Sequence, residues 1–172
     1  MSLKQEMQAE IITRRVDYAN ATDRDALCTL LNHYACDPMG GGSAIAPTVL
    51  ARLCDDLAAR PFAFSFIAWA QTAQGEQPAG LTNCFEGYST FKAAPLINIH
   101  DIVVHSPWRG QGVGQKLMQA VELEARTRQA CKITLEVLTG NHVAMKSYAH
   151  FGFVPYALDP KAGTATYLQK WL

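Results

Sequence analysis

An apolar segment that runs directly into a glycine-rich turn limits the folds open to this chain more than any other feature. The segment, residues 96–105, is rich in isoleucine and valine, which predicts a strand. Glycine then occupies every second position of the turn, at Gly110, Gly112 and Gly114. Apolar residues recur four positions apart over residues 112–129, which predicts a helix. A strand, a turn and a helix in this order indicate an α/β fold.

The turn has the properties of a phosphate-binding site. The first N–H groups of a helix have no partner inside the helix, and the helix dipole is positive there. Glycine lets a ligand approach these groups closely, and Arg109 adds positive charge at the edge of the turn. The dinucleotide-binding fingerprint needs glycine where Gln115 or Leu117 stands, and the Gly-Lys-Ser/Thr of nucleotide-binding phosphate loops is absent. A glycine turn without a ligand stays an open alternative at this point.

Two motifs give the chain a resemblance to a known family. Arg109, Gly112 and Gly114 fill the pattern Arg/Gln-x-x-Gly-x-Gly/Ala, which resembles the coenzyme A pyrophosphate loop of the GCN5-related N-acetyltransferases (GNAT family). Downstream, residues 141–148 and 152–153 are similar to that family's Asn-x-x-Ala-x-x-x-Tyr and Gly-Phe signature. One predicted helix and one predicted strand separate the two motifs, as in the family.

The resemblance implies a fold and an acyl donor. A single N-acetyltransferase domain over residues 1–172 is expected, α/β in class, with a mixed, mostly antiparallel sheet whose central strands splay apart between flanking helices. The clear match covers residues 96–157, whereas the N-terminal half matches only in the order of its elements. Acetyl-coenzyme A is expected in the gap between the splayed strands. The implied contacts with it come from Ile102, Val103, Val104, Arg109, Gly110, Gln111, Gly112, Val113, Gly114, Gln115, Asn141 and Tyr148.

The resemblance also implies a catalytic residue. In the family, a deprotonated amine attacks the thioester directly in a ternary complex, and a tyrosine protonates the sulfur as it leaves. Tyr148 matches that tyrosine, and a phenol with an ordinary pKa of about 10 is protonated at neutral pH. A core tyrosine on a short helix is the alternative for Tyr148, and a helix N-cap is the alternative for Asn141.

The base that deprotonates the amine is left open among several residues. Asp101 ranks first, Glu136 second and Glu86 third, because these carboxylates belong to strands that would flank the gap. His100 and His105 are weaker candidates, since histidines at strand ends are more often solvated. Strand alternation puts Asp101 and His105 on one face and His100 on the other. No cluster of His, Cys and Asp has the spacing of metal ligands, so no metal is expected.

The acceptor is expected to be a primary amine of a small molecule or a peptide. In relatives, the first two helices, their loop and the third and fourth strands shape the acceptor pocket. The corresponding residues here are Tyr34, Asp37, the loop 39–43, Glu86 and Tyr88. Three alternatives stay open: a non-catalytic coenzyme A-binding module, a structural protein with a degenerate loop, and an acyltransferase with another acyl donor or a hydroxyl acceptor.

Charge and cysteine content argue against several other classes of protein. Fifteen basic residues balance fifteen acidic ones, which gives no support for a nucleic-acid or membrane partner. The five cysteines are odd in number and form no Cys-x-x-Cys, which favours reduced thiols in a cytoplasmic protein. Residues 1–10 lack the apolar core of a signal peptide, and the apolar run 62–70 is too short to span a bilayer. A homodimer, common among relatives, stays open.

Hydrophobic periodicity predicts the remaining elements of this 172-residue chain. One helix is expected to begin near Thr22, which would cap it, and Gly152 is expected to end the last helix. Helices are predicted over residues 47–60, 112–129 and 142–150. Strands are predicted over residues 11–18, 62–71, 79–88, 96–105, 132–138, 153–156 and 164–171.

Overall fold

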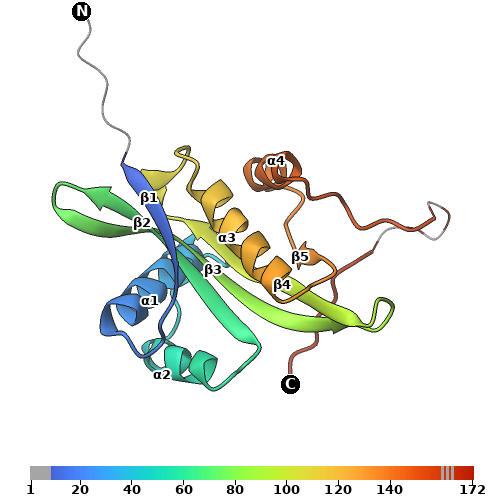
Figure 1. Cartoon of the computed structure of the whole chain (residues 1–172), viewed down its shortest axis with the longest axis horizontal. Helices are drawn as coiled ribbons and strands as arrows, with labels where there is room; N and C mark the ends of the chain where they lie inside the picture. Colours follow the sequence, from blue (N-terminus) through green and yellow to red (C-terminus); the bar gives the residue numbers. More distant parts are fainter. Residues whose placement is uncertain (1–8, 160, 162, 164) are drawn as a thin grey trace, which may run out of the picture.

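A five-stranded sheet forms the centre of the fold, and helices cover both of its faces (Figure 1). The computed structural model describes residues 9–159, 161, 163 and 165–172. Its strands are β1 (Glu10–Arg15), β2 (Ala63–Thr72), β3 (Gly75–Ser89), β4 (Ala94–Val104) and β5 (Ile133–Leu135). Its helices are α1 (Ala21–Cys36), α2 (Pro47–Ala58), the 3-10 turn η1 (Ser106–Trp108), α3 (Val113–Thr127) and α4 (His142–Phe151).

The sheet is mixed and mostly antiparallel, which confirms the predicted fold class. Its strand order is β1-β2-β3-β4-β5, and the first four strands pair antiparallel with their neighbours. β5 pairs with β4 in parallel, because the chain crosses over through α3 between these two strands. β2 ends at Thr72 and β3 begins at Gly75, so their connection is tighter than the gap between the strands predicted over residues 62–71 and 79–88.

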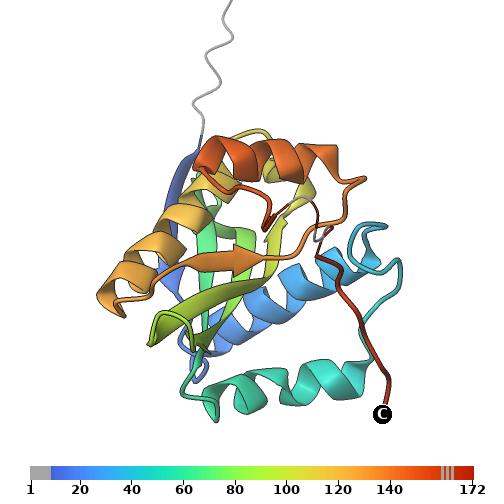
Figure 2. The ribbon, with the colours of Figure 1, turned by 90° about the vertical axis from the view of Figure 1, so that its right-hand side faces the viewer.

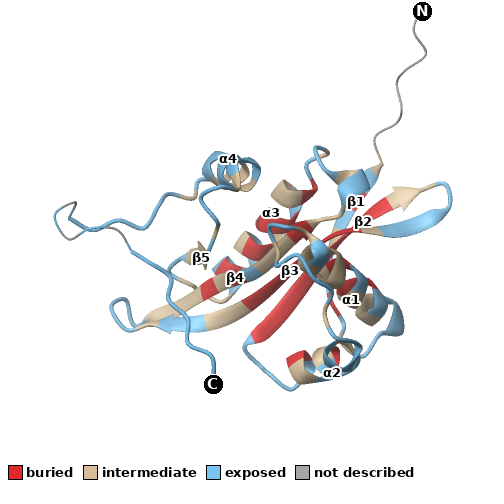
Figure 3. Ribbon diagram, turned by 180° about the vertical axis from the view of Figure 1, so that it is seen from behind, coloured by how far each residue is buried: buried red, intermediate tan, exposed pale blue. Residues whose placement is uncertain are grey.

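Two apolar layers hold the helices against the sheet. α3 packs on one face through residues such as Leu117 and Val121. α1 and α2 pack on the opposite face through Leu27, Leu30 and Leu57. β2 contributes side chains to both layers, which explains why its sequence is a nearly continuous apolar run. Figure 3 shows the buried residues gathered along β2, β3 and parts of α1 and α3.

Most predicted elements are confirmed, with shifted boundaries. The first helix is capped by Asn20 rather than by Thr22, because the Asn20 side chain accepts from the N–H of Asp23 at 3.1 Å. Gly152 follows α4 with a left-handed φ of 107°, as predicted. The strand predicted over residues 132–138 shortens to β5, since only its central residues pair with β4.

The strands predicted over residues 153–156 and 164–171 are not formed in the described part of the chain, and Thr164 lies outside it. Alternating apolar residues form a strand only where a neighbouring strand offers hydrogen bonds and a surface to pack on. Figure 1 shows the segment beyond α4 running outside the sheet. Large apolar side chains of this segment, such as Tyr156 and Trp171, are therefore exposed.

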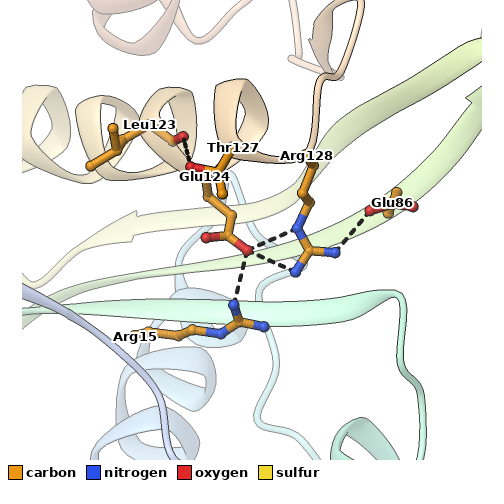
Figure 4. Close-up of polar contacts among 6 residues, drawn as sticks. All are labelled: Arg15, Glu86, Leu123, Glu124, Thr127 and Arg128. Carbon is orange, nitrogen blue, oxygen red and sulfur yellow. Dashed lines mark hydrogen bonds and ion pairs between the residues drawn. The ribbon is translucent and has the colours of Figure 1, made fainter.

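A network of ion pairs holds the C-terminal end of α3 to the sheet (Figure 4). Arg128 pairs with Glu124 at 2.7 Å and with Glu86 at 2.8 Å. Glu124 also pairs with Arg15 at 2.9 Å. The guanidinium of Arg128 lies 4.5 Å from the centre of the Phe64 ring. The network thus joins α3 to β1, β2 and β3, and it gives Glu86 a structural partner.

Replacing Arg128 by methionine is expected to lower the free energy of unfolding by about 1–3 kcal/mol, because two carboxylates lose a charged hydrogen-bond donor. The Arg128 side chain is only 19% exposed, so water replaces the lost contacts poorly. Arg126→Met is the matched control: Arg126 is 75% exposed, and its pair with Glu122 is expected to contribute less than about 0.5 kcal/mol. Urea unfolding measures both losses, and equal losses would contradict a stabilising role of the network.

Candidate active site

The site begins where β4 and β5 separate, which confirms the predicted splay of the central strands. In the described part of the chain, β5 pairs with β4 only at residues 97–99, although β4 continues to Val104. The N–H of His105 donates to the carbonyl oxygen of Ala79 at 2.9 Å, toward β3. Successive residues of a strand turn their backbone groups to opposite sides, so the peptide groups of Ile102 and Val104 point into the gap. This edge of β4 is open to an extended ligand.

A β-bulge in β4 decides which side chains face which helix. The register of β4 against β3 shifts at His100, which is an extra residue. Ile99 packs toward α3 before the bulge, whereas Asp101 lies on the α1 side, where Asn83 donates to it at 2.9 Å. His100 also rests on the α1 side, with its ring centre 5.4 Å from that of Phe85. The expectation that His100 and Asp101 face opposite sides is therefore wrong, because alternation fails across a bulge.

A cleft of about 750 Å³ runs along the open edge of β4. Its walls come from the end of β4, the glycine turn, the start of α3, α4 and the end of α1. Figure 2 shows α4 on one side of β5 and α1 on the other. The cleft is lined by these implied coenzyme contacts: Ile102, Val103, Val104, Arg109, Gly110, Gly112, Val113, Gly114, Gln115, Asn141 and Tyr148. Gln111 is not among them, and its side-chain amide donates to the carbonyl oxygen of Pro107 at 3.0 Å.

Other residues line the cleft as well. Tyr34, Asp37 and Met39 lie at its α1 side, as expected for part of the acceptor pocket. Glu86 and Tyr88 do not line it. Ala144, a matched position of the second motif, also lines the cleft. The motif analysis missed a further group of lining residues, most of which are neighbours in sequence of matched positions: Met118, Gly140, His142, Val143 and Ser147.

The glycine turn presents a row of backbone N–H groups to the cleft. Gly112 precedes α3 with a φ of 78° and Gly110 has a φ of 76°, both in the left-handed region. Among the described residues, no acceptor is present for the N–H groups of residues 110–115. Unpaired N–H groups at the positive end of a helix dipole fit a bound phosphate. The geometry therefore matches the expected pyrophosphate loop, although the contact itself stays a prediction.

Arg109 connects the turn to the loop after α1. Its Nε donates to the carbonyl oxygen of Val104 at 3.1 Å, and its terminal nitrogen pairs with the Asp37 carboxylate at 3.1 Å. Asp37 also accepts from the backbone N–H of Met39 at 2.9 Å. The Met39 hydrogen bond, followed by that from Arg109, lowers the pKa of Asp37. This ion pair therefore joins the glycine-turn side of the cleft to its α1 side.

Tyr148 reaches the cleft from α4 in a half-buried position. Burial, with a smaller contribution from the nearby Tyr34, raises the pKa of Tyr148 to about 12. Its ring meets that of Phe153 edge to face, with centres 6.0 Å apart. Gln115 on α3 donates to the carbonyl oxygen and hydroxyl of Ser147 at 3.2 and 3.1 Å, which ties α4 to α3. The phenol of Tyr148 is therefore protonated at neutral pH and held at the cleft wall.

Asn141 acts as the N-cap of α4. Its side-chain oxygen accepts from the N–H of Ala144 at 3.1 Å. The capping role, one of the two considered for this residue, is confirmed. Asn141 also lines the cleft, so its contact with a coenzyme stays a prediction.

None of the three candidate carboxylates lines the cleft, but the charge of Asp101 acts on Tyr34, which does. The pKa of Tyr34 is raised first by burial of its ring and second by the negative charge of Asp101. Glu136 is exposed, accepts from the Asn98 side chain at 3.3 Å and does not line the cleft. Glu86 belongs to the ion-pair network of α3. Asp101 therefore remains the first candidate among the three carboxylates.

The described residues give three further observations. No group of three or more His, Cys, Asp or Glu side chains among them is placed to hold a metal ion. None of the helices they form has both the length and the apolar character needed to cross a membrane. The cysteines are all free thiols: Cys28, Cys36, Cys54, Cys84 and Cys131.

Solved structures with the same fold include several acetyltransferases. A probable acetyltransferase aligns with a TM-score of 0.74 and 18% identity over 95% of this chain and 98% of the other. AAC(6')-Iy in complex with the bisubstrate analogue CoA-S-monomethyl-acetylneamine aligns with a TM-score of 0.73 and 16% identity over 95% and 100%. A ribosomal-protein-alanine N-acetyltransferase from Brucella melitensis biovar Abortus 2308 aligns with a TM-score of 0.67 and 16% identity over 94% and 100%. At these identities the structures establish a shared fold.

A match to a family model covers most of the chain. The model described as the acetyltransferase (GNAT) family matches residues 29–153, a range that includes the glycine turn and α4. The same range holds the splayed strands and the residues that line the cleft. The chain therefore belongs to the GNAT family of acetyltransferases and is an acyltransferase of the N-acetyltransferase type.

Proposed function

We propose that residues 1–172 act as one domain that transfers an acetyl group from acetyl-coenzyme A to a primary amine of a small molecule or a peptide. One cleft carries this proposal, because it joins the glycine turn, the open edge of β4 and Tyr148. Residues from both faces of the sheet line it, Tyr34 on one and Tyr148 on the other. A donor and an acceptor bound from opposite sides would meet there in a ternary complex.

The residues of the cleft fit acetyl-coenzyme A as the acyl donor. The unpaired N–H groups of residues 110–115 suit the pyrophosphate. Among the described residues, the peptide groups of Ile102 and Val104 have no strand partner on the gap side, and they suit the amides of the pantetheine arm. When bound, acetyl-coenzyme A supplies the activated acyl group.

Tyr148 and Asp101 divide the proton transfers in the proposed reaction. The amine loses a proton to Asp101, directly or through water, and its nitrogen then forms a bond to the acyl carbon. As the carbon–sulfur bond breaks, Tyr148 donates its proton to the departing sulfur. The tyrosinate then takes up the extra proton that the attacking nitrogen still carries, which leaves a neutral amide and restores the phenol. Burial raises the pKa of Tyr148 to about 12, which keeps this donor loaded at neutral pH.

The acceptor side of the cleft guides the choice of amines to test. Tyr34 contributes a phenol group there, and Met39 contributes an apolar surface. The Asp37 carboxylate is already paired with Arg109, so its charge is not free for a cationic acceptor. Among the similar structures are an aminoglycoside N-acetyltransferase and a ribosomal-protein-alanine N-acetyltransferase. Small-molecule amines and peptide amino termini therefore both belong in the test set.

The compartment and the partners follow from composition. Free cysteines favour a reducing compartment, and the cytoplasm is the proposed location. The balance of acidic and basic residues supports a small-molecule or peptide acceptor rather than a nucleic acid or a membrane surface.

Calorimetric titration of the purified protein tests the donor first. Acetyl-coenzyme A is expected to bind with micromolar affinity, because the turn offers a row of free N–H groups beside an open strand edge. ATP and NAD serve as controls, since they carry similar phosphates without the pantetheine arm. Equal affinity for all three ligands, or no binding of acetyl-coenzyme A, would contradict the proposed donor.

A panel of amines separates an enzyme from a module that only binds coenzyme A. Suitable acceptors are sisomicin, free lysine and a peptide that begins with alanine. A thiol-reactive dye measures the release of coenzyme A, and mass spectrometry identifies the acetylated product. Binding of acetyl-coenzyme A without transfer to any amine of the panel would favour the non-catalytic module.

A further inference from the structure

A chain of hydrogen bonds crosses the α1 side of the sheet and ends on Asp101. The hydroxyl groups of Tyr18 and Ser65 lie 2.8 Å apart. Ser65 donates to the side-chain oxygen of Asn83 at 2.6 Å. The side-chain nitrogen of Asn83 donates to Oδ2 of Asp101 at 2.9 Å. The chain therefore connects the segment after β1 to β2, β3 and β4 in order.

The chemistry of its ends gives this chain one direction. The Asp101 carboxylate accepts hydrogen bonds, so the Asn83 amide must turn its NH2 group toward it. The amide oxygen of Asn83 then faces Ser65 and accepts a hydrogen bond from the Ser65 hydroxyl group. The Ser65 oxygen consequently accepts from Tyr18, and burial raises the pKa of Tyr18, which keeps its hydroxyl protonated. Every donor points toward Asp101.

The two inner members of the chain lie in an apolar layer. Ser65 is 1% exposed and Asn83 is 4% exposed. Their neighbours on the same face of the sheet include Ile67, Leu81 and Val103. A buried polar group costs free energy unless it is hydrogen-bonded, and apolar residues would pack at these positions without that cost. Packing alone therefore does not account for a serine and an asparagine here.

The bulge at His100 brings Asp101 to the end of this chain. If β4 alternated regularly through His100, Asp101 would share the α3 face with Ile99 and would turn away from Asn83. Asp101 instead lies near Tyr34, the cleft residue on α1. Among the described residues, only Asn83 donates a hydrogen bond to this carboxylate, and that bond goes to the Oδ2 atom of Asp101. Oδ1 is left to take a proton.

We propose that Asn83, held in turn by Ser65, is a positioning residue that fixes the Asp101 carboxylate for proton abstraction from the acceptor amine. A donor chain that ends on one carboxylate oxygen restricts the rotation of the side chain and stabilises its charge. The inference rests on the proposed function, in which Asp101 is the general base. It adds to that function two residues that neither motif contains.

The test compares substitutions on neighbouring residues of β2 and β3. Asn83→Leu keeps a similar volume but removes the amide, and it is expected to lower kcat about tenfold to a hundredfold through misplacement of the base. Ser65→Ala, which acts one step further away, is expected to have a smaller effect in the same direction. Thr82→Val is the matched control, because Thr82 is also buried and its hydroxyl has no hydrogen-bond partner among the described residues. Kd for acetyl-coenzyme A is expected to stay unchanged in all three variants.

A double-mutant cycle separates positioning from a merely structural role. If Asn83 acts through Asp101, Asn83→Leu is expected to cost less than about twofold in kcat once Asp101→Asn is present. Thermal melting shows whether each variant is folded. Undiminished kcat in folded Asn83→Leu, or a full additional loss in the double variant, would overturn the inference while acetyl transfer by the wild type stands. No transfer by the wild-type protein to any amine of the panel would instead overturn the proposed function, and the inference with it.

Discussion

Replacing Tyr148 by phenylalanine is expected to lower kcat by about ten- to a thousandfold, the range typical of a lost general acid. The substitution removes one hydroxyl from a half-buried ring and keeps its edge-to-face contact with Phe153. The sulfur must then leave without a positioned proton donor, which raises the barrier of the step that breaks the carbon–sulfur bond. Steady-state release of coenzyme A from acetyl-coenzyme A measures the effect.

Binding must persist for the loss to be assigned to chemistry. Calorimetry is expected to give the Tyr148→Phe variant nearly the wild-type Kd for acetyl-coenzyme A, because the proposed phosphate site lies in the glycine turn. Tyr156→Phe is the matched control, since Tyr156 is exposed beyond α4 and does not line the cleft. Wild-type turnover by the Tyr148→Phe variant would remove this residue from the mechanism.

The pH dependence of turnover gives an independent check on Tyr148. The pKa of Tyr148 is raised to about 12, so its phenol stays protonated at pH values at which an ordinary phenol has already lost its proton. Loss of this proton therefore contributes no fall in kcat as the pH rises from about 8 to 10. A fall in that range that disappears in the Tyr148→Phe variant would show that this phenol titrates at lower pH than its buried position implies.

Replacing Gly112 by valine is expected to weaken binding of acetyl-coenzyme A by about a hundredfold or more. Gly112 has a φ of 78°, which strains a β-branched residue by about 1–3 kcal/mol. Relief of that strain turns the N–H groups of the turn away from the ligand, and the branched side chain also fills space beside the phosphate. Every 1.4 kcal/mol of lost interaction is a tenfold increase in Kd.

A second glycine of the same turn supplies the control. A Cβ atom at Gly114 would lie 3.7 Å from a methyl carbon of Val104, an ordinary contact, so Gly114→Ala is expected to change Kd less than about threefold. Calorimetry measures both variants after thermal melting has shown that they are folded. If Gly112→Val binds as tightly as Gly114→Ala, the turn is not the phosphate site.

Local features of the sequence predicted the donor half of the site. The glycine turn and the start of α3 are set by backbone conformations that neighbouring residues alone determine, so their positions in the chain were readable. The same holds for α4, which lies between its Asn141 cap and Gly152. Asp101 ranked first among the candidate bases, but strand alternation misplaced His100 because a bulge depends on pairing with β3.

The remaining parts of the site depend on contacts between segments far apart in the chain. Arg109 meets Asp37, and Asn83 meets Asp101, only because α1, β3 and β4 pack side by side. Strand propensity beyond α4 predicted two strands that the described residues do not form, since a strand also needs a partner.

By itself, the sequence determined the order of the elements up to α4, the glycine turn and the tyrosine of α4, because these follow from short-range backbone preferences and motif spacing. Only the tertiary structure decided how far β4 and β5 separate and which face of the sheet Asp101 occupies. It also decided which buried polar groups reach that carboxylate. The physical reason is that hydrogen bonds between strands and packing between helix and sheet depend on residues distant in the chain, which no local pattern encodes.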